Sequence, residues 1–361
     1  MRFVSLQKKI LIIKTGMIGD VLMAVPAIRL FRSRYPEAKL SLLVGDWARA
    51  VIDGNPDLDE IISFDETIFI KKNILELFKL IRKLRNRRFD DVFILHRSSK
   101  YIVFSMFIGA KRKIGYDLGS ISRMLLSNSI PVFKKEHEMD KCLKLAAFSI
   151  SGGIEYDDKD KDMKIYLSDV ERVEAAKLAK ELKIDFNHLV IGIAAGGAKN
   201  PREHFPHKRW SASNYGILAD SIIDRNDKIQ LVFCGSPDDM DIIRGVTGNM
   251  RNSDKVVMAA GQTTLRQFAA LVERFQLFIT HDSGPMHIAA AMGTPVISVF
   301  GPTDSESLSP PGSKNRVVKA NIWCSPCYSD KGVPECENNH LCMKAVSVES
   351  VLKVVNQRDS S

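Results

Sequence analysis

Residues 8–31 read KKILIIKTGMIGDVLMAVPAIRLF, and this stretch decides the fold of the amino-terminal half. The apolar run 10–14 is rich in β-branched residues, which is typical of a strand buried in a parallel sheet. A glycine-containing turn follows, and then a helical pattern extends to about Tyr35. A strand that leads through a turn into a helix begins a βαβ unit. The turn lacks the full G-x-G-x-x-G spacing of a dinucleotide-binding loop.

The same alternation of strands and helices continues along the chain. The patterns predict strands at 39–45, 59–65 and 90–96, and a long basic helix over 70–88. The alternation weakens in the charged stretch 149–162 and restarts with predicted strands at 188–197, 228–236, 255–261, 277–284 and 294–302. Alternation of this kind predicts an α/β protein with parallel sheets.

The weakened stretch divides the chain into predicted domains. We expect an amino-terminal domain over 1–165 and a carboxy-terminal domain over 166–345 that includes a Cys-rich segment, 324–342. Residues 346–361 are expected to form a helix and tail that can pack back on the amino-terminal domain. With 361 residues, 45% of them hydrophobic, the chain is long enough for two cores.

The composition limits the partners and the compartment. The formal net charge of +9 favours anionic partners, although it also serves solubility. No apolar run reaches the roughly 18 residues of a membrane span. Lys8, Lys9 and Lys14 interrupt the amino-terminal apolar stretch, which argues against a signal peptide. We therefore expect a cytoplasmic protein.

The segment 71–88 contains eight Lys or Arg residues and one Glu, with apolar residues at helical spacing. The simpler interpretation is an amphipathic helix with a solvated basic face. The alternative is peripheral docking on the inner, anionic face of a membrane. Nucleic acid is not a predicted partner, because the segment lacks the interleaved aromatic residues on which bases stack.

The strongest chemical signal is residues 278–304, FITHDSGPMHIAAAMGTPVISVFGPTD. An apolar strand ends in a polar turn, and a short helix follows, with Pro285 suited to its first turn and Gly293 suited to the position past its end. The amino end of a helix favours a diphosphate because its N–H groups are unpaired. Simple capping accounts for Asp282 or Ser283, but not also for the histidines His281 and His287.

A second glycine turn lies at Gly196-Gly197, where a predicted strand leads into a long polar loop. Such glycines let backbone amides approach a phosphate, and basic side chains neutralise its charge. The basic residues of this loop are Lys199, Arg202, Lys208 and Arg209. The loop is not a Walker motif, because no GK[ST] opens the helix. Taken alone, the pattern fits an ordinary basic loop better than a phosphate site.

Four blocks together resemble the family 9 glycosyltransferases, the heptosyltransferases of lipopolysaccharide assembly and their relatives. They are KTGMIGDVLMAVPAIRLFRSRYPEAKL (14–40), AAGG (194–197) with HKRWS (207–211), HDSGPMHIAAAMGTPVISVFGPTD (281–304), and the cysteines that begin with CSPC (324–327). The resemblance implies a GT-B fold, in which two Rossmann-like domains face each other across a cleft. It also implies an inverting, metal-independent transfer of a sugar from a nucleotide donor, such as ADP-heptose, to a glycan or glycolipid acceptor.

The resemblance also implies roles for individual residues. Asp20 matches the base that deprotonates the acceptor hydroxyl, and Lys208 matches the lysine that stabilises the leaving diphosphate. Gly16 and Gly19 are expected to make room for the acceptor sugar. On the donor side the matching positions are Gly196, Gly197, Arg209, Asp282, Ser283, Gly284 and His287, with Asp239 (or its neighbour Asp238) for the ribose and Met258 for the adenine.

Four cysteines, Cys324, Cys327, Cys336 and Cys342, lie within one short segment, and the first pair has CxxC spacing. This pattern predicts a structural site for Zn or Fe, while a cluster of free thiols is the simpler alternative. No cofactor is expected to take part in catalysis.

Two other functions fit parts of the sequence. A sugar-nucleotide epimerase shares the GT-B architecture but needs further acid–base groups, of which no convincing set is evident. A basic binding module with a metal finger leaves Asp20 and the donor-like turn unexplained. Among transferases, the acceptor can be a lipopolysaccharide core sugar, another glycan or a protein side chain.

Overall fold

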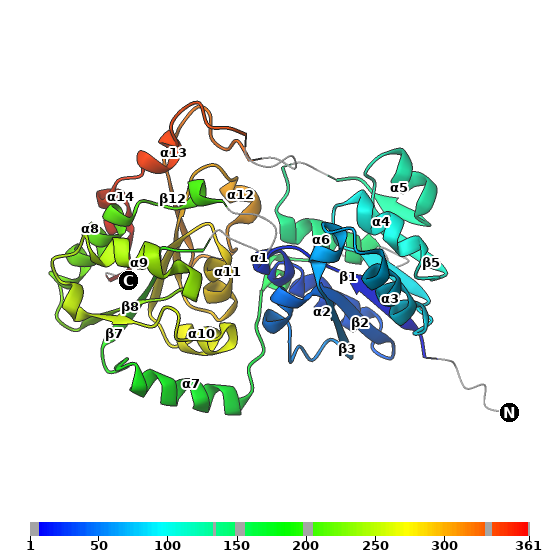
Figure 1. Ribbon diagram of the computed structural model, residues 1–361, viewed down its shortest axis with the longest axis horizontal. Helices are drawn as coiled ribbons and strands as arrows, with labels where there is room; N and C mark the ends of the chain where they lie inside the picture. The colour runs from blue at the N-terminus through cyan, green and yellow to red at the C-terminus, as the bar shows by residue number, and fades with distance from the viewer. Residues whose placement is uncertain (1–6, 133–134, 149–155, 198–204, 329–333, 360–361) are drawn as a thin grey trace. The chain divides into compact units, whose positions relative to one another are not determined.

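The chain divides into two units, Met1–Tyr166 and Leu167–Ser361. Figure 1 shows the computed structural model, which describes residues 7–132, 135–148, 156–197, 205–328 and 334–359. The predicted domain boundary, 165/166, therefore lies one residue from the division in the structure. Each unit contains one six-stranded sheet, and all strand pairs in both sheets are parallel.

The amino-terminal unit alternates strands and helices as the sequence predicts. Its strands are β1 (Lys9–Ile13), β2 (Lys39–Gly45), β3 (Glu60–Phe64), β4 (Asp91–Ile94), β5 (Arg112–Tyr116) and β6 (Asn128–Ile130). Its helices are α1 (Ile18–Leu22), α2 (Val25–Arg34), α3 (Ile74–Arg85), α4 (Ser99–Met106), α5 (Ser120–Leu125) and α6 (Glu138–Phe148), with 3₁₀ turns η1 (Asp46–Val51), η2 (Glu66–Phe69) and η3 (Asp158–Lys161).

The strand order in this sheet is β3-β2-β1-β4-β5-β6, the order of Rossmann-like dinucleotide-binding folds. The chain moves from β1 outward to β3 and then crosses back through α3 to β4. Because such crossovers are right-handed, α2 and α3 cover opposite faces of the sheet. A core cluster joins β1 and β4 to α3 and α4, while α2 packs against α6.

The stretch that opened the sequence analysis folds largely as predicted. Ile10–Ile13 are completely buried in the centre of the sheet. Pro26 lies in the first turn of α2, so the regular helix begins there and is not kinked by it. A separate short helix, α1, precedes it and carries Asp20. After β2, residues Asp46–Val51 form the 3₁₀ turn η1.

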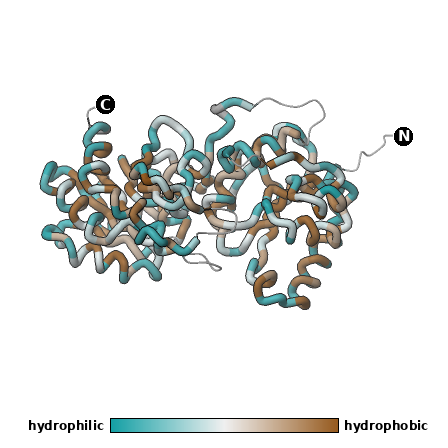
Figure 2. Tube along the Cα trace, turned by 90° about the horizontal axis from the view of Figure 1, so that it is seen from above, coloured by the Kyte–Doolittle hydropathy of each residue, from teal (hydrophilic) through white to brown (hydrophobic). Residues whose placement is uncertain are grey.

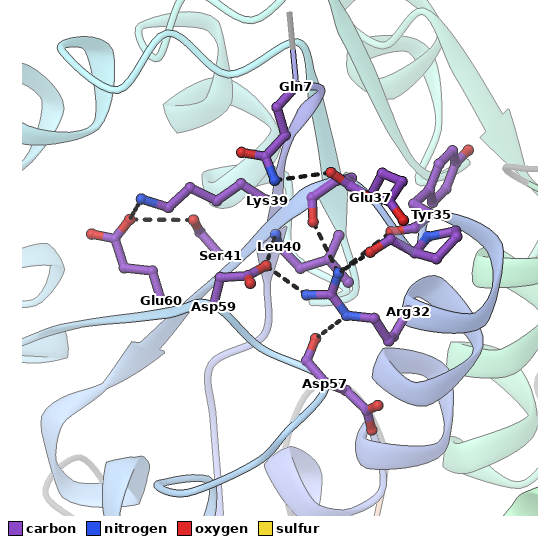
Figure 3. A network of polar contacts seen from close by, with 12 residues as sticks. Gln7, Arg32, Tyr35, Glu37, Lys39, Leu40, Ser41, Asp57, Asp59 and Glu60 are labelled. Carbon is purple, nitrogen blue, oxygen red and sulfur yellow. Dashed lines mark hydrogen bonds and ion pairs between the residues drawn. The ribbon is translucent and has the colours of Figure 1, made fainter.

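Arg32 holds the connection between α2 and β2, as Figure 3 shows. Its guanidinium donates to the backbone oxygens of Asp57 (3.1 Å) and Ala38 (2.9 Å) and to the carboxylate of Asp59 (2.5 Å). Asp59 in turn accepts the backbone N–H of Leu40 at 2.7 Å. This network lies at the amino ends of β2 and β3, whereas Asp20 follows the carboxyl end of β1.

The carboxy-terminal unit repeats the arrangement. Its strands are β7 (Leu189–Ala194), β8 (Ile229–Phe233), β9 (Val256–Met258), β10 (Leu277–His281), β11 (Val296–Phe300) and β12 (Arg316–Lys319). Its helices are α7 (Asp169–Glu181), α8 (Ala212–Ile223), α9 (Met240–Thr247), α10 (Leu265–Val272), α11 (Gly284–Ala291), α12 (Ser305–Leu308), α13 (Leu341–Lys344) and α14 (Val348–Asp359), with 3₁₀ turns η4 (Pro206–Lys208), η5 (Pro237–Asp239) and η6 (Ser253–Lys255).

The order β12-β11-β10-β7-β8-β9 is again the Rossmann-like order, starting from β7 as the first strand. The predicted α/β class with two Rossmann-like domains is therefore confirmed. In both units, hydrophobic residues (brown in Figure 2) alternate with hydrophilic ones (teal) along the helices, as expected for helices that each bury one side. None of the helices in the described part of the chain is long and apolar enough to cross a membrane.

The last helix, α14, packs against α8, β11 and β12, and Val351 and Val355 belong to the core of the carboxy-terminal unit. Trp210 also reaches the preceding loop, where its indole N–H donates to the oxygen of Val346 at 2.9 Å. The segment 346–361, which the sequence analysis treats separately, is therefore grouped with this unit. Its packing on the amino-terminal domain stays a prediction.

Candidate active site

In each sheet the strand order reverses next to the first strand, between β1 and β4 and between β7 and β10. Open parallel sheets bind ligands outside the carboxyl ends of the strands at this point, because the loops on either side diverge and leave a crevice. The loop after β1 carries Gly16 and Asp20. The loops after β7 and β10 carry Gly196, Gly197 and Asp282. These predicted residues therefore lie at the switch point of their unit, whereas Met258 ends the edge strand β9.

The turn around Asp20 depends on a glycine. Gly16 has a φ of +115°, and a Cβ added there would lie 2.7 Å from Oδ2 of Asp20. That oxygen accepts the backbone N–H of Met17 at 2.8 Å, so Asp20 closes the first turn of α1 while remaining partly exposed. The neighbouring Gly19 is buried inside α1. Asp20 is thus held in one orientation at the rim of the sheet.

Glu66 supports this turn, although the sequence analysis did not single it out. Its buried carboxylate accepts the backbone N–H of Gly16 (3.2 Å), the indole N–H of Trp47 (2.7 Å) and the hydroxyl of Tyr101 (3.4 Å). Glu66 is separated from Gly16 by 50 positions, and no local pattern connects them. Only the fold, which brings η2 next to the end of β1, reveals the contact.

A charged cluster lies beneath the same edge of the sheet. Arg97 and Lys141 both donate to Oε1 of Glu138 at 2.7 Å. Lys14 is buried nearby, where its ammonium lies 3.9 Å from the thiol of Cys142. Burial lowers the pKa of Lys14, but the charges of Cys142, Asp20 and Glu138 raise it more, so its pKa lies above the ordinary value. A buried cation therefore lies close to Asp20.

The glycine turn of the carboxy-terminal unit is packed against Asp239. A Cβ on Gly196 would lie 2.4 Å from the side chain of Asp239, and Gly197 has a φ of +86°. The backbone N–H of Gly197 donates to Oδ1 of Asp239 at 2.6 Å, while the N–H and hydroxyl of Ser236 donate to Oδ2 at 2.8 and 2.7 Å. Asp239 is buried and Asp238 is exposed. Asp239 therefore shapes the turn, and its ribose role stays a prediction.

The structure brings together Asp282 and Lys208, which the sequence separates by 74 positions. The ammonium of Lys208 donates to Oδ2 of Asp282 at 2.9 Å, and the hydroxyl of Thr303 donates to the same oxygen at 2.8 Å. Burial raises the pKa of Asp282, but Lys208 and Thr303 lower it more, so the net pKa lies below the ordinary value. Asp282 is ionised at neutral pH and holds Lys208 in place.

The helix α11 begins at this point. Pro285 lies in its first turn, and Gly293, with a φ of +82°, lies just past its end, as the sequence predicts. Ser283 occupies the N-cap position, but its hydroxyl makes no capping hydrogen bond and instead contacts the hydroxyl of Thr280 at 3.3 Å. The first N–H groups of α11, from Gly284 onward, therefore donate no hydrogen bond to the Ser283 hydroxyl.

The two histidines of this segment differ in their surroundings. His281 ends β10 completely buried, with Nδ1 3.1 Å from the hydroxyl of Tyr215. Burial lowers the pKa of His281 to about 4, so the ring is neutral. His287, in α11, is also buried. His281 therefore belongs to the core, and the donor-binding role of His287 stays a prediction.

Two further residues that were predicted to bind the sugar nucleotide are Arg209 and Met258. The guanidinium of Arg209 donates to the backbone oxygen of Gly197, at 2.7 Å from Nη2 and 3.1 Å from Nε, and therefore braces the glycine turn. Met258 ends β9 and is half-buried. Its contact with an adenine stays a prediction. Lys199 and Arg202 lie outside the described residues.

Cys324, Cys327 and Cys336 lie in the loop between β12 and α13, and Cys342 lies in α13. Burial raises the pKa of the Cys327 and Cys342 thiols, and the other cysteines of the segment raise it further, which places them near one another. Within the ranges that the structure describes, however, no three His, Cys, Asp or Glu side chains are grouped so as to hold a metal ion. The predicted metal site therefore has no geometric support and stays a prediction.

Comparisons with known proteins agree with this arrangement. Lipopolysaccharide heptosyltransferase 2 of Escherichia coli (strain K12) is 26% identical over 318 residues, covering 86% of this chain and 88% of that protein. A solved glycosyl transferase family 9 protein from Veillonella parvula DSM 2008 superimposes with a TM-score of 0.81 at 23% identity, covering 97% of this chain and 96% of that one.

A second solved structure, E. coli ADP-heptose lps heptosyltransferase II, gives a TM-score of 0.75 at 23% identity and covers 98% of this chain and all of the other. These likenesses support the GT-B class. Residues 77–336, well over half of the chain, match glycosyltransferase family 9 (heptosyltransferase). The chain therefore belongs to glycosyltransferase family 9 and is a glycosyltransferase.

Proposed function

We propose that this enzyme transfers a heptose from ADP-heptose to the lipopolysaccharide core or a related glycan, with inversion at the anomeric carbon and without a metal ion. The observation that carries the proposal is the Lys208–Asp282 pair at the β7/β10 switch point, beside the Gly196–Gly197 turn and the amino end of α11. Similarity to enzymes named as heptosyltransferases supports the choice of sugar and acceptor.

In the proposed reaction the carboxy-terminal unit binds the donor. Lys208 contacts the diphosphate, and the N–H groups at the start of α11 point toward it. As the bond between the anomeric carbon and the diphosphate oxygen breaks, negative charge develops on ADP. A cation and backbone N–H groups that are already oriented stabilise this charge without reorganising. Asp282 supports the reaction by holding Lys208 rather than by contacting phosphate, since like charges repel.

The amino-terminal unit supplies the base. A sugar hydroxyl attacks the anomeric carbon on the face opposite to ADP and passes its proton to Asp20. A positioned carboxylate contributes roughly 10²–10⁴-fold to such a reaction. Gly16 and Glu66 hold the turn that presents Asp20, and Gly16 and Gly19 leave space for the acceptor. In this proposal Asp20 accepts the proton of the acceptor hydroxyl, and Lys208 stabilises the negative charge that develops on ADP.

We further propose that the enzyme works in the cytoplasm, at the inner face of an anionic membrane. The lipopolysaccharide core is attached to lipid, so a peripheral enzyme would remain near its acceptor. The net charge of +9 favours such a surface.

We propose that the four cysteines hold a structural metal. Metal binding then requires the cysteines to move together from the positions described above. Metal analysis of protein prepared without chelators tests this idea. About one Zn or Fe per chain, lost in a Cys324→Ser/Cys327→Ser variant but kept in Cys234→Ser, supports a tetrathiolate site. Substoichiometric metal in well-folded protein identifies the four cysteines as free thiols.

A transfer assay read by mass spectrometry tests the proposed function. The purified enzyme is incubated with ADP-heptose, ADP-glucose or UDP-glucose and with either a lipopolysaccharide core oligosaccharide or a peptide. We expect a mass increase of one heptose on the core oligosaccharide with ADP-heptose alone. Transfer to the peptide identifies a protein acceptor, and interconversion of the nucleotide sugar without transfer identifies an epimerase.

A further inference from the structure

Exposed apolar side chains are concentrated in one region of the amino-terminal unit. Of the eighteen large hydrophobic side chains that are exposed in the described part of the chain, ten lie between residues 70 and 124. They are Ile70, Ile74, Leu75, Phe78, Val103, Met106, Phe107, Leu118, Ile121 and Met124. Single exposed apolar residues are common, but a contiguous group indicates a binding surface.

The helix α3 presents its part of this group on one face. Ile74 and Phe78 are four residues apart, and Leu75 lies beside them, so all three project from the same side. They are 78%, 61% and 64% exposed, whereas Leu80 and Leu84 on the opposite side are buried in the core. The outward face of α3 is thus apolar in its first half. In its second half the same face carries Arg82 and Arg85.

The helices α4 and α5 lie on the same side of the sheet as α3. Core residues from α3 and α4 belong to one cluster on β1 and β4, and α4 packs against α5. Phe69, in η2 just before α3, makes an edge contact with Phe104 of α4 at 5.6 Å between ring centroids, and the ammonium of Lys100 lies 5.6 Å from the same ring. Figure 1 shows α3, α4 and α5 together.

Basic residues surround the apolar ones. Residues 71–88 contain eight Lys or Arg and one Glu, and residues 97–127 contain six Lys or Arg and one Asp. Both acids are neutralised within the segment: Glu76 pairs with Lys79 at 2.7 Å, and Asp117 pairs with Arg123 at 2.8 Å. Four of these cations pair with acids outside the two segments: Arg87 with Glu60, Arg97 with Glu138, Lys111 with Asp90 and Arg112 with Asp91. The face formed by α3, α4 and α5, here called the basic apolar face, therefore owes its positive charge mainly to exposed residues at the two ends of α3: Lys71, Lys72, Arg82, Lys83, Arg85 and Arg88.

We propose that the basic apolar face docks the enzyme on an anionic lipid bilayer, with apolar side chains of α3, α4 and α5 inserted among the acyl chains and Lys and Arg side chains on the headgroups. Amphipathic surfaces of this composition bind membrane interfaces through buried apolar area and attraction to anionic lipid. A second copy of this chain is the less suitable occupant, because a symmetric contact would place the same positive surface against itself.

The inference rests on the proposed function only for its biological setting, since it places the enzyme beside a lipid-linked acceptor. Two separate measurements distinguish a failure of the docking proposal from a failure of the proposed function. Vesicle binding tests the face without any sugar donor, and transfer to a water-soluble core oligosaccharide tests the chemistry without any membrane.

The direct test is sedimentation of the full chain with vesicles of phosphatidylcholine containing 30–40% phosphatidylglycerol, about the composition that gives a strongly negative surface. We expect binding that weakens greatly in 0.5 M salt, because the Debye length falls from about 30 Å at 0.01 M ionic strength to between about 3 and 8 Å. Phe78→Ser/Phe107→Ser and Arg82→Gln/Arg85→Gln should each reduce binding by at least about tenfold, since each Lys or Arg near such a surface contributes about fivefold.

Matched variants on α7 of the other unit serve as controls. Val170→Ser/Val173→Ser removes two exposed apolar side chains, and Lys177→Gln/Lys180→Gln removes two exposed charges. Both should bind vesicles as the unmodified protein does, and all four variants should transfer sugar normally to the soluble oligosaccharide. Absence of vesicle binding by the unmodified protein, or equal loss in the α7 variants, would overturn the proposal. A dimer that dissociates in Phe78→Ser/Phe107→Ser would overturn it in favour of a contact between copies.

Discussion

The Asp282 carboxylate accepts hydrogen bonds from Lys208 and Thr303 through a single oxygen. Lys208 is largely buried, and its ammonium also lies 5.3 Å from the ring of Phe205 and 5.1 Å from that of Tyr328. A lysine restrained in this way is already oriented when a diphosphate arrives, so less freedom is lost on binding. This restraint on Lys208 explains why an acid stands in the proposed phosphate site.

The contact from Thr303 makes a specific prediction. Thr303→Val keeps the shape of the side chain but removes a donor to a buried carboxylate, at a cost of about 1–3 kcal/mol in stability. Because Asp282 then holds Lys208 less firmly, the KM for the sugar nucleotide should rise roughly fivefold, corresponding to about 1 kcal/mol. Initial-rate kinetics with varied donor measure this change.

Thr294→Val is the matched control. Thr294 is also buried, and its hydroxyl donates to the backbone oxygen of Val272, away from Lys208. This variant should lose stability and keep the KM for the donor. Equal KM values for the two variants would show that Thr303 has only a structural role.

His281 predicts how stability depends on pH. The buried ring has a pKa of about 4, against 6.5 in the unfolded chain, so the unfolded state binds more protons between these values. As the pH falls from 7 to 5, protonation of His281 in the unfolded chain therefore lowers the free energy of unfolding by about 2 kcal/mol. Urea unfolding of His281→Gln should show a pH dependence that is smaller by this amount.

Tyr215→Phe provides the control for this measurement. It removes the hydroxyl next to Nδ1 of His281 but leaves the ring buried, and burial is the main cause of the lowered pKa. This variant should keep the loss of stability between pH 7 and 5. An unchanged pH dependence in His281→Gln would mean that other groups cause it.

At the scale of elements, the turn after β7 is defined by the absence of a side chain at Gly196. A Cβ there would overlap Asp239, which is fixed by Ser236 and Gly197. Gly196→Ala should displace the turn, destabilise the protein by about 1–3 kcal/mol and weaken ADP binding. Thermal unfolding and calorimetric titration with ADP measure the two effects.

Gly245→Ala, in α9 of the same unit, is the matched substitution. A Cβ at Gly245 would make only an ordinary contact, 3.7 Å from Cβ of Ala212. Alanine favours a helix over glycine, so this variant should be as stable as the unmodified protein or slightly more so. Normal ADP binding by Gly196→Ala would show that the turn does not depend on its glycine.

The buried central strands were predictable because their apolar runs stand out from their surroundings. Three strands were missed for the opposite reason: β5 is RKIGY, β6 has only three residues, and β12 is RVVK with exposed ends. Short or basic strands of this kind lack the apolar run by which strands are recognised. The edge strands β3 and β9 were predicted, within 59–65 and 255–261. The length of α3 was overestimated, since the basic pattern of 70–88 continues beyond the helix, Ile74–Arg85.

The candidate site was predictable where a motif is local and unpredictable where the fold assembles it. Asp282 and Gly196 stand in recognisable strand-to-helix turns. Glu66 and Thr303 act through contacts with residues that lie 50 and 21 positions away, and neither belongs to a periodic pattern. His96 is similar: its Nδ1 lies 3.1 Å from the backbone oxygen of Thr15, 81 positions earlier.

At the scale of the whole molecule, the two units share the same strand order but present different chemical groups. Each has a glycine turn after its first strand, and in each a buried carboxylate, Glu66 or Asp239, accepts the N–H of a glycine in that turn. The turns differ in what they present. The amino-terminal turn presents a partly exposed acid, Asp20, while the carboxy-terminal turn lies beside a cation, Lys208. This difference suits one unit to proton transfer and the other to phosphate binding.

The most direct test of this division is a comparison of Asp20→Asn with the unmodified enzyme, in which ADP-heptose binding and sugar transfer are measured separately. Asparagine keeps the shape and can still accept the N–H of Met17, but it cannot take a proton from the acceptor. We expect unchanged affinity for ADP-heptose and a loss of transfer of at least about 100-fold. Transfer at the normal rate by Asp20→Asn would contradict it.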